Sequence, residues 1–132
     1  MYSMQTLNPS DLPQPAGPYS QAVLVHGAGE WLHVSGQVGI DAQGIAPAGI
    51  EAQAELAWGN LLRALRGAGM GMEHLVKTTT YLVNRADNAA MRPIRSRCLG
   101  QHRPASTLVL VAGLLDEAWL IEVEAVAFRP AD

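Results

Sequence analysis

Two kinds of hydrophobic pattern follow one another along the chain and predict a mixture of strands and helices. Segments that alternate apolar and polar positions, or that are rich in β-branched residues, predict strands. The expected strands are 3–7, 21–25, 31–38, 74–83, 105–111 and 119–128. The segment 26–30 separates the second strand from the third and predicts a hairpin loop. Four prolines and a glycine in 8–18 predict an extended, irregular loop.

Helical spacing begins at residue 50, where apolar residues recur every three or four positions through residue 68. A second helix is expected to start at Asp87 or Asn88 and to end at Gly100. Pro93 lies inside it, and an interior proline costs a helix about 3 kcal/mol. We therefore expect either a separate turn at 87–91 or a kink in this helix.

The predicted elements leave one face of the sheet without a cover. Two helices can cover only one face, yet the strands carry apolar residues on both, as where Val109 stands between Leu108 and Leu110. A second apolar face needs a partner layer. Other copies of the chain are the simplest partner, so the pattern predicts a homo-oligomer.

The composition fits one domain spanning residues 1–132. Nine basic and twelve acidic side chains give a net charge of −3, and charged residues make up 16%, below the roughly 25% typical of soluble domains. We therefore do not expect nucleic acid or an anionic membrane as a partner. Either biased codon usage or a large surface buried between copies explains the low charge content.

The sequence also predicts a cytoplasmic protein. It has no run of about 18 apolar residues that would span a membrane, and its first residues do not have the pattern of a signal peptide. The single cysteine, Cys98, cannot form an internal disulfide, which is compatible with a reducing compartment.

Two glycine-containing segments are candidates for ligand contact. Gly17 and Pro18 fix a tight bend just before a strand, and such a bend can orient Tyr19 and the hydroxyl of Ser20. Ser35 and Gly36 lie inside a predicted strand, where a glycine indicates a bulge or a close backbone approach. The alternatives are an ordinary junction between loop and strand and a bulge without a ligand.

The charged candidates are a pair of carboxylates and a group of arginines. Glu122 and Glu124 share one face of a strand with bulky apolar residues, and burial there would raise a carboxyl pKa and suit it to proton transfer. The alternative is a solvated strand face. Four arginines could hold a carboxylate or phosphate, or could form a solvated helix face. They are Arg92, Arg95, Arg97 and Arg103.

Metal and cofactor chemistry is not expected. The four histidines have no ligand spacing, and Cys98 has no partner cysteine. The sequence also contains no phosphate-binding glycine loop and no nucleophile elbow.

Four motifs in order carry a resemblance to a known family. They are Gly-Pro-Tyr-Ser-Gln-Ala at 17–22, Ser-Gly-Gln at 35–37, Pro-Ala-Ser-Thr at 104–107 and Glu-Val-Glu-Ala-Val-Ala at 122–127. Together they resemble the Rid family, also called YjgF-like or reactive intermediate deaminase proteins. The resemblance implies an α+β, chorismate-mutase-like fold with a mixed sheet and two helices on one face. It also implies a homotrimer with its sheets inward and a ligand pocket between subunits.

The resemblance further implies hydrolysis of a small-molecule enamine or imine to a 2-keto acid and ammonia, without a metal or an organic cofactor. Glu122 matches the glutamate that positions water, and Tyr19 matches the pocket tyrosine. Ser35 and Gly36 match the segment that lines the pocket. We therefore expect an imine deaminase with Glu122 and Tyr19 as its catalytic residues.

One position departs from the pattern of the archetypal deaminases. Ser106 stands where their Pro-Ala-Arg-Ser motif has an arginine that binds the substrate carboxylate. A charge-assisted hydrogen bond contributes about 1.5–3 kcal/mol, so its loss would weaken carboxylate recognition. Arg92 or Arg103 could substitute, and with Ser106 they complete the expected binding residues. The alternative is a trimer that binds or senses a metabolite without turning it over.

Overall fold

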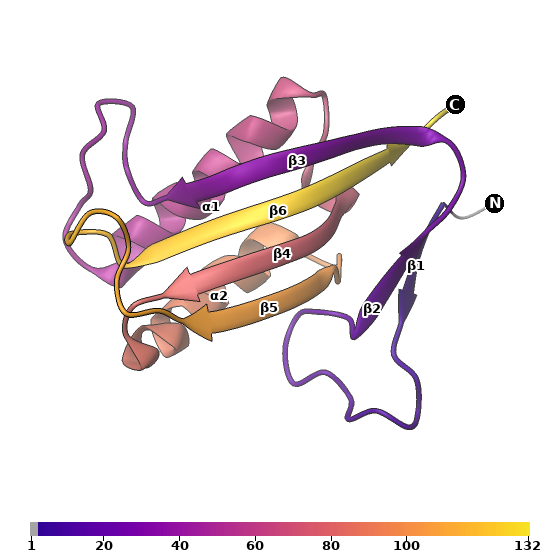
Figure 1. Cartoon of the computed structure of the whole chain (residues 1–132), viewed down its shortest axis with the longest axis horizontal. Coiled ribbons are helices and arrows are strands. Elements are labelled where there is room, and N and C mark those ends of the chain that lie inside the picture. The colour runs from indigo at the N-terminus through magenta and orange to yellow at the C-terminus, as the bar shows by residue number, and fades with distance from the viewer. Residues whose placement is uncertain (1–2) are drawn as a thin grey trace.

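Both helices lie behind a four-stranded mixed sheet, on the same face of it (Figure 1). The computed structural model describes residues 3–132. Its strands and helices, in chain order, are β1 (Met4–Leu7), β2 (Ala22–Val25), β3 (Gly29–Val38), α1 (Ile50–Gly67), β4 (Leu75–Leu82), α2 (Asn88–Leu99), β5 (Ala105–Leu110) and β6 (Ile121–Pro130), with short 3-10 turns η1 (Met72–His74) and η2 (Arg85–Asp87). The predicted α+β class, with two helices on one face, is confirmed.

The four-stranded sheet has the order β3-β6-β4-β5. Strand β6 runs antiparallel to both β3 and β4, whereas β4 and β5 are parallel. The parallel pair requires a crossover, which α2 supplies between β4 and β5. Because β5 is an edge strand and α2 lies behind it, this edge offers both strand and helix residues to a site.

The predicted hairpin at 26–30 is wrong. Strand β2 pairs with β1 in a separate two-stranded sheet, in which Thr6 is opposite Val23, and β3 pairs with β6 instead. Residues Gly29 and Glu30 already belong to β3. A glycine-rich segment between two strands therefore connects two different sheets here, because strand partners are chosen by tertiary packing and not by the connecting turn alone.

Helix α2 runs without interruption from Asn88 to Leu99, although Pro93 lies inside it. Of the two alternatives, a separate turn at 87–91 or a kink, the separate turn is therefore wrong, and the 3-10 turn η2 comes earlier, at Arg85–Asp87. Proline lacks the amide proton that would bond to the carbonyl four residues back, here Ala89 in the first turn. The helix tolerates that loss because its other face is packed: Met91 and Ile94 are buried in the core.

The core lies between the helices and the sheet. Helix α1 contributes a fully buried stripe that includes Trp58, Leu61 and Leu65. Along β6, Ile121 and Val123 are buried in the same cluster, and the residues that alternate with them point to the opposite face. This alternation gives the sheet one face packed on helices and one open face.

The open face combines apolar and polar side chains. The rings of Trp31 and Phe128 pack with centroids 5.0 Å apart, yet Trp31 remains 51% exposed. Val109 on β5 is 39% exposed. Lys77 donates a hydrogen bond of 2.6 Å to the Thr107 hydroxyl across β4 and β5. The second, partly apolar face expected from the strand pattern is therefore present in the single chain.

Neither helix within residues 3–132 is long and apolar enough to cross a bilayer.

Candidate functional site

The Gly17–Ser20 segment is tied to the start of β5. Ser20 is only 2% exposed, and its hydroxyl donates a 2.6 Å hydrogen bond to the carbonyl of Arg103. Its backbone amide donates to the carbonyl of Pro104 at 3.0 Å. Just before Ser20, the backbone amide of Tyr19 donates a hydrogen bond of 2.8 Å to the carbonyl of Gly17. The two anchors fix the direction in which Tyr19 leaves the loop.

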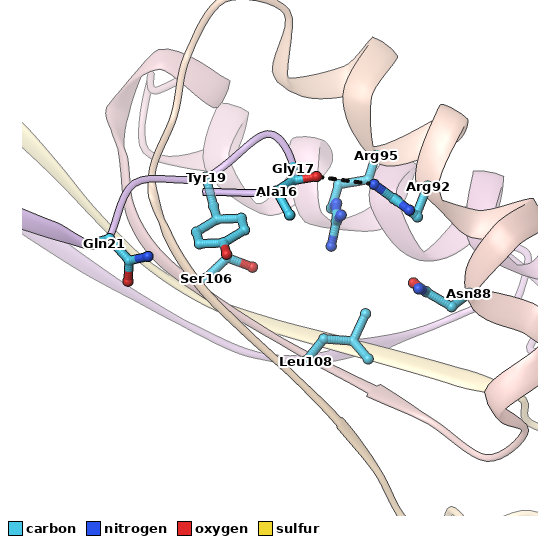
Figure 2. A pocket seen from close by; sticks show the side chains of 9 residues that line it. All are labelled: Ala16, Gly17, Tyr19, Gln21, Asn88, Arg92, Arg95, Ser106 and Leu108. Atoms are coloured by element: carbon cyan, nitrogen blue, oxygen red, sulfur yellow. Dashed lines mark hydrogen bonds between the residues drawn. The ribbon is translucent and has the colours of Figure 1, made fainter. Parts of the chain in front are cut away.

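A cavity of about 460 Å³ lies between this loop, α2 and β5 (Figure 2). The loop, the helix and the strand each form one wall. The residues that line it are Ala16, Gly17, Tyr19 and Gln21 from the loop, Asn88, Arg92 and Arg95 from α2, and Ser106 and Leu108 from β5. Three of the expected site residues, Tyr19, Arg92 and Ser106, are therefore brought together.

The charge of this cavity is positive. Arg92 and Arg95 lie one turn apart on α2, and none of the lining residues is acidic. Arg92 donates a hydrogen bond to the carbonyl of Ala16 at 3.3 Å, which ties α2 to the loop. Figure 2 shows the Arg95 side chain pointing from α2 into the cavity. The arrangement suits an anion.

Arg95 is the most buried charged group of the site. It is 7% exposed, and its Nε has no hydrogen-bond partner within residues 3–132. Burial lowers the pKa of the Arg95 guanidinium, and the neighbouring charge of Arg92 lowers it further. The sequence predicts a basic group that includes Arg95, but it does not single out Arg95 as a site residue. The available signal was its spacing of three from Arg92 on a helix.

Arg103 lies outside the cavity lining. Its guanidinium donates to the carbonyls of Gly100 at 2.7 Å and His102 at 2.9 Å. These bonds use the side chain to close the turn between α2 and β5. The structure therefore places Arg92, and not Arg103, in the lining of the same cavity as Ser106.

A second group of expected residues lies on β3 and β6. The pairing of these strands shifts register between Val34 and Gln37, so the predicted irregularity at Ser35 and Gly36 is present. A Cβ built on Gly36 would lie 2.6 Å from Cδ of Glu122 and 2.9 Å from its Oε2. The glycine thus allows the Glu122 carboxylate to lie directly against the backbone of the bulge.

The two groups do not meet within one chain. Glu122 is on β6, Ser106 is on β5, and β4 lies between these strands. Ser106 pairs with Thr78, which is buried on the helix side, whereas Glu122 alternates with core residues and lies on the open face. Neither Ser35, Gly36 nor Glu122 lines the cavity of Tyr19 and Ser106.

The histidines and the cysteine do not form a cluster in the part of the chain that the structure describes. No group of three or more His, Cys, Asp or Glu side chains within residues 3–132 could hold a metal ion. Burial raises the pKa of the Cys98 thiol, which makes it less reactive than a free cysteine.

Comparisons with known proteins identify the class. A family model described as Endoribonuclease L-PSP matches residues 9–129. A crystal structure of a Rid-family protein of unknown function from Yersinia pestis superposes with a TM-score of 0.84, at 31% identity, covering 96% of this chain and 98% of that one. The chain belongs to this family, the Rid or YjgF-like proteins, and has their chorismate-mutase-like fold.

Relatives with assigned names give the family more detail. A RutC family protein from Pyrococcus horikoshii is 34% identical over 119 residues, covering 89% of this chain and 91% of the relative. A protein of Rattus norvegicus named 2-iminobutanoate/2-iminopropanoate deaminase is 34% identical over 127 residues, covering 95% and 90%. The resemblance inferred from the four motifs is thus confirmed at the level of the family.

Proposed function

We propose that this protein hydrolyses small enamines or imines to a 2-keto acid and ammonia, with Glu122 positioning the attacking water. The observation that carries the proposal is the contact between Glu122 and the glycine bulge at Gly36. It holds a carboxylate on the open face of the sheet, beside backbone that a side chain would otherwise cover. The similarity to a 2-iminobutanoate/2-iminopropanoate deaminase supports the same reaction class.

The proposed reaction needs only water and a proton carrier. An enamine first tautomerises to an imine, whose carbon is electrophilic. Water adds to this carbon while a carboxylate such as Glu122 accepts the water proton and returns it to the nitrogen. The hydroxyl proton of the resulting carbinolamine then passes to the nitrogen as the C–N bond breaks, so that ammonia leaves and a C=O bond remains. No electrons are exchanged, so the proposed reaction needs no redox cofactor, and a carboxylate can carry the protons that it moves.

We further propose that the complete site forms between copies of the chain, in a homotrimer with its sheets inward. The cavity with Tyr19 opens at the β5 edge, and Glu122 lies on the open face, so one chain alone supplies two half-sites. A second copy that packs its open face against the first would join them. Trp31 and Val109 are exposed on that face at opposite edges of the sheet, and this supports such packing, because an apolar sheet face needs a second layer to cover it.

The cytoplasm is the proposed location, and the substrate is the proposed small-molecule partner. The arginines that could have formed a basic surface for nucleic acid have different partners and do not form one surface. Arg97 pairs with Glu55, Arg103 bonds to backbone carbonyls, and Arg92 lies at the cavity. This dispersal supports a metabolite and not RNA or a membrane as the partner.

Hydrolysis of 2-aminoacrylate, coupled to reduction of the released 2-keto acid, tests the proposal. We expect turnover by the wild type and a loss of at least a hundredfold in Glu122→Gln, which keeps the shape but not the charge. Glu117→Gln, on an exposed loop, is the matched control and should keep wild-type turnover. Equal rates for the wild type and Glu122→Gln would contradict the assigned role.

A second candidate function is metabolite binding without turnover. Ser106 favours it, because a hydroxyl on β5 stands in the cavity where the archetypal deaminases have an arginine. Thermal-shift measurements with small 2-keto acids separate the two functions. Stabilisation by these acids together with no turnover of any imine would favour the binding protein.

A further inference from the structure

Arg95 carries a charge that the described chain does not neutralise. The side chain is nine-tenths buried, its Nε has no partner, and within residues 3–132 it takes part in no ion pair. Removing a guanidinium from water without a partner is costly in free energy. Such a group is stable in a fold when a ligand supplies the missing partner.

The surroundings of Arg95 direct this charge into the cavity. A Cβ built on Gly17 would lie 3.7 Å from Nη2 of Arg95 and 3.7 Å from Cδ1 of Tyr19, so the loop packs on the guanidinium beside the tyrosine ring. Arg92 lies one turn earlier on the same face of α2 and lines the same cavity. Two guanidinium groups face one cavity without an acidic lining residue, and an anion between them would relieve their repulsion.

We propose that Arg95, assisted by Arg92, binds the carboxylate of the ligand, so that the anion-binding group of this protein comes from α2 and not from β5. The assignment rests on the proposed function only for the class of ligand, a small organic acid. The guanidinium offers two parallel N–H donors to a carboxylate, which gives orientation as well as affinity.

The other walls of the cavity limit the rest of the ligand. The hydroxyl groups of Tyr19 and Ser106 can bond to an oxygen or nitrogen next to the carboxylate. Leu108 offers an apolar surface at the same wall as Ser106. A 2-oxo or 2-imino acid with a short aliphatic side chain fits these walls: it has a carboxylate for Arg95, an adjacent oxygen or nitrogen for the hydroxyl groups, and an apolar group for Leu108.

Direct binding tests the assignment independently of catalysis. Calorimetric titration of the wild type with 2-oxobutanoate, with its neutral methyl ester and with inorganic phosphate separates the possible ligands. We expect the acid to bind and the ester to bind at least tenfold more weakly, since it lacks the charge. Phosphate binding without 2-oxobutanoate binding would overturn the proposal.

Two variants and one control identify the residue. Arg95→Gln should weaken 2-oxobutanoate binding by about tenfold to a hundredfold, and Arg95→Lys should recover part of the affinity. Arg97→Gln is the matched control, because Arg97 lies on the same helix but pairs with Glu55 outside the cavity. It should bind like the wild type. Unchanged affinity in Arg95→Gln would show that the proposal is wrong.

Measurements of stability and molar mass without ligand test whether Arg95 has a purely structural role. If the Arg95 guanidinium has no partner until a ligand binds, Arg95→Gln should unfold at the same temperature as the ligand-free wild type, or higher, and should keep the same molar mass. A markedly lower unfolding temperature or a changed mass would mean that the guanidinium already has a partner, and would refute the assignment. Binding of 2-oxobutanoate through Arg95 without turnover of any imine would uphold it while rejecting the proposed hydrolysis.

Discussion

Gly36 and Glu122 lie so close together that a single methyl group at position 36 would collide with the carboxylate, 2.6 Å from its Cδ. The two residues are 86 positions apart in sequence and meet where the β3–β6 pairing shifts register. The backbone of Gly36 does not have a positive φ, so conformational freedom is not the reason for a glycine here. The reason is space for the Glu122 side chain.

Gly36→Ala should therefore displace Glu122. We expect the free energy of unfolding to fall by about 1–3 kcal/mol, because a methyl group is forced into an occupied position. The proposed hydrolysis should fall by at least tenfold, since a shift of about 1 Å in a catalytic group has effects of this size. Chemical denaturation and 2-aminoacrylate turnover measure both.

Gly113→Ala is the control for that variant, because a Cβ at position 113 meets nothing within 4 Å and the residue has no positive φ. It should unfold like the wild type and keep its turnover. If Gly36→Ala behaved in the same way as Gly113→Ala, the close contact would have no functional consequence.

Glu122 and Glu124 should differ in function although they share a strand face. Glu124 accepts a hydrogen bond from the Tyr81 hydroxyl, whereas Glu122 lies against the glycine bulge. We expect Glu122→Gln to lose turnover and Glu124→Gln to retain most of it, measured on 2-aminoacrylate at saturating enzyme. The reverse order would move the water-positioning role to Glu124.

The Tyr81–Glu124 hydrogen bond should make stability sensitive to alkaline pH. The hydrogen bond with Glu124 raises the pKa of Tyr81 above its usual value of about 10. A pKa raised in the folded state favours folding below pH 10, and this contribution disappears as the pH rises through the folded-state pKa. Thermal unfolding between pH 8 and about 12 should therefore show a larger alkaline loss in the wild type than in Tyr81→Phe. Identical pH profiles would argue against the bond.

Ser20→Ala should loosen the loop that presents Tyr19. The variant removes the hydrogen bond to the Arg103 carbonyl and leaves that partly buried acceptor without its partner, at a cost of about 1–2 kcal/mol in unfolding free energy. We expect KM for the imine to rise more than kcat falls, because the loop shapes the cavity without reacting. An effect confined to kcat would point to a direct chemical role for Ser20 instead.

Val109→Asp should disrupt the proposed trimer. A carboxylate on the open face would have to be desolvated when sheets pack inward, which costs several kcal/mol if it remains unpaired. Light scattering after gel filtration should show a trimer for the wild type and a smaller species for the variant. Ile45→Asp, on an exposed loop, should leave the mass unchanged. A monomeric wild type would reject the assembly itself.

Local patterns were sufficient to predict most of the elements. The helix expected at 50–68 is observed at Ile50–Gly67, because its apolar stripe matches the helical period and packs on the sheet. The strand expected at 105–111 is observed at Ala105–Leu110. The pairings of β2 with β1 and of β3 with β6 could not be predicted, because each is decided by contacts between segments that are distant in sequence.

The site was harder to predict than the fold. Tyr19 and Ser106, predicted from motifs, and Arg92, predicted as one of two arginines that could replace the missing one, meet in one cavity. Arg95 was not selected, because a helix carrying several arginines does not show which of them faces inward until the loop with Gly17 is packed against it. The spacing of three places Arg95 on the same helix face as Arg92, but burial of that face is a tertiary property that the spacing does not show.

The tie between Ser20 and Arg103 also determines when during synthesis the cavity can exist. Its walls come from the beginning, the third quarter and the last quarter of the chain, and Ser20 reaches a carbonyl 83 residues further on. A nascent chain must therefore expose β5 beyond the ribosome before any ligand can bind. Binding of the proposed ligand would then stabilise the folded chain as a whole, by an amount that grows with the logarithm of ligand concentration, and would leave shorter intermediates unprotected.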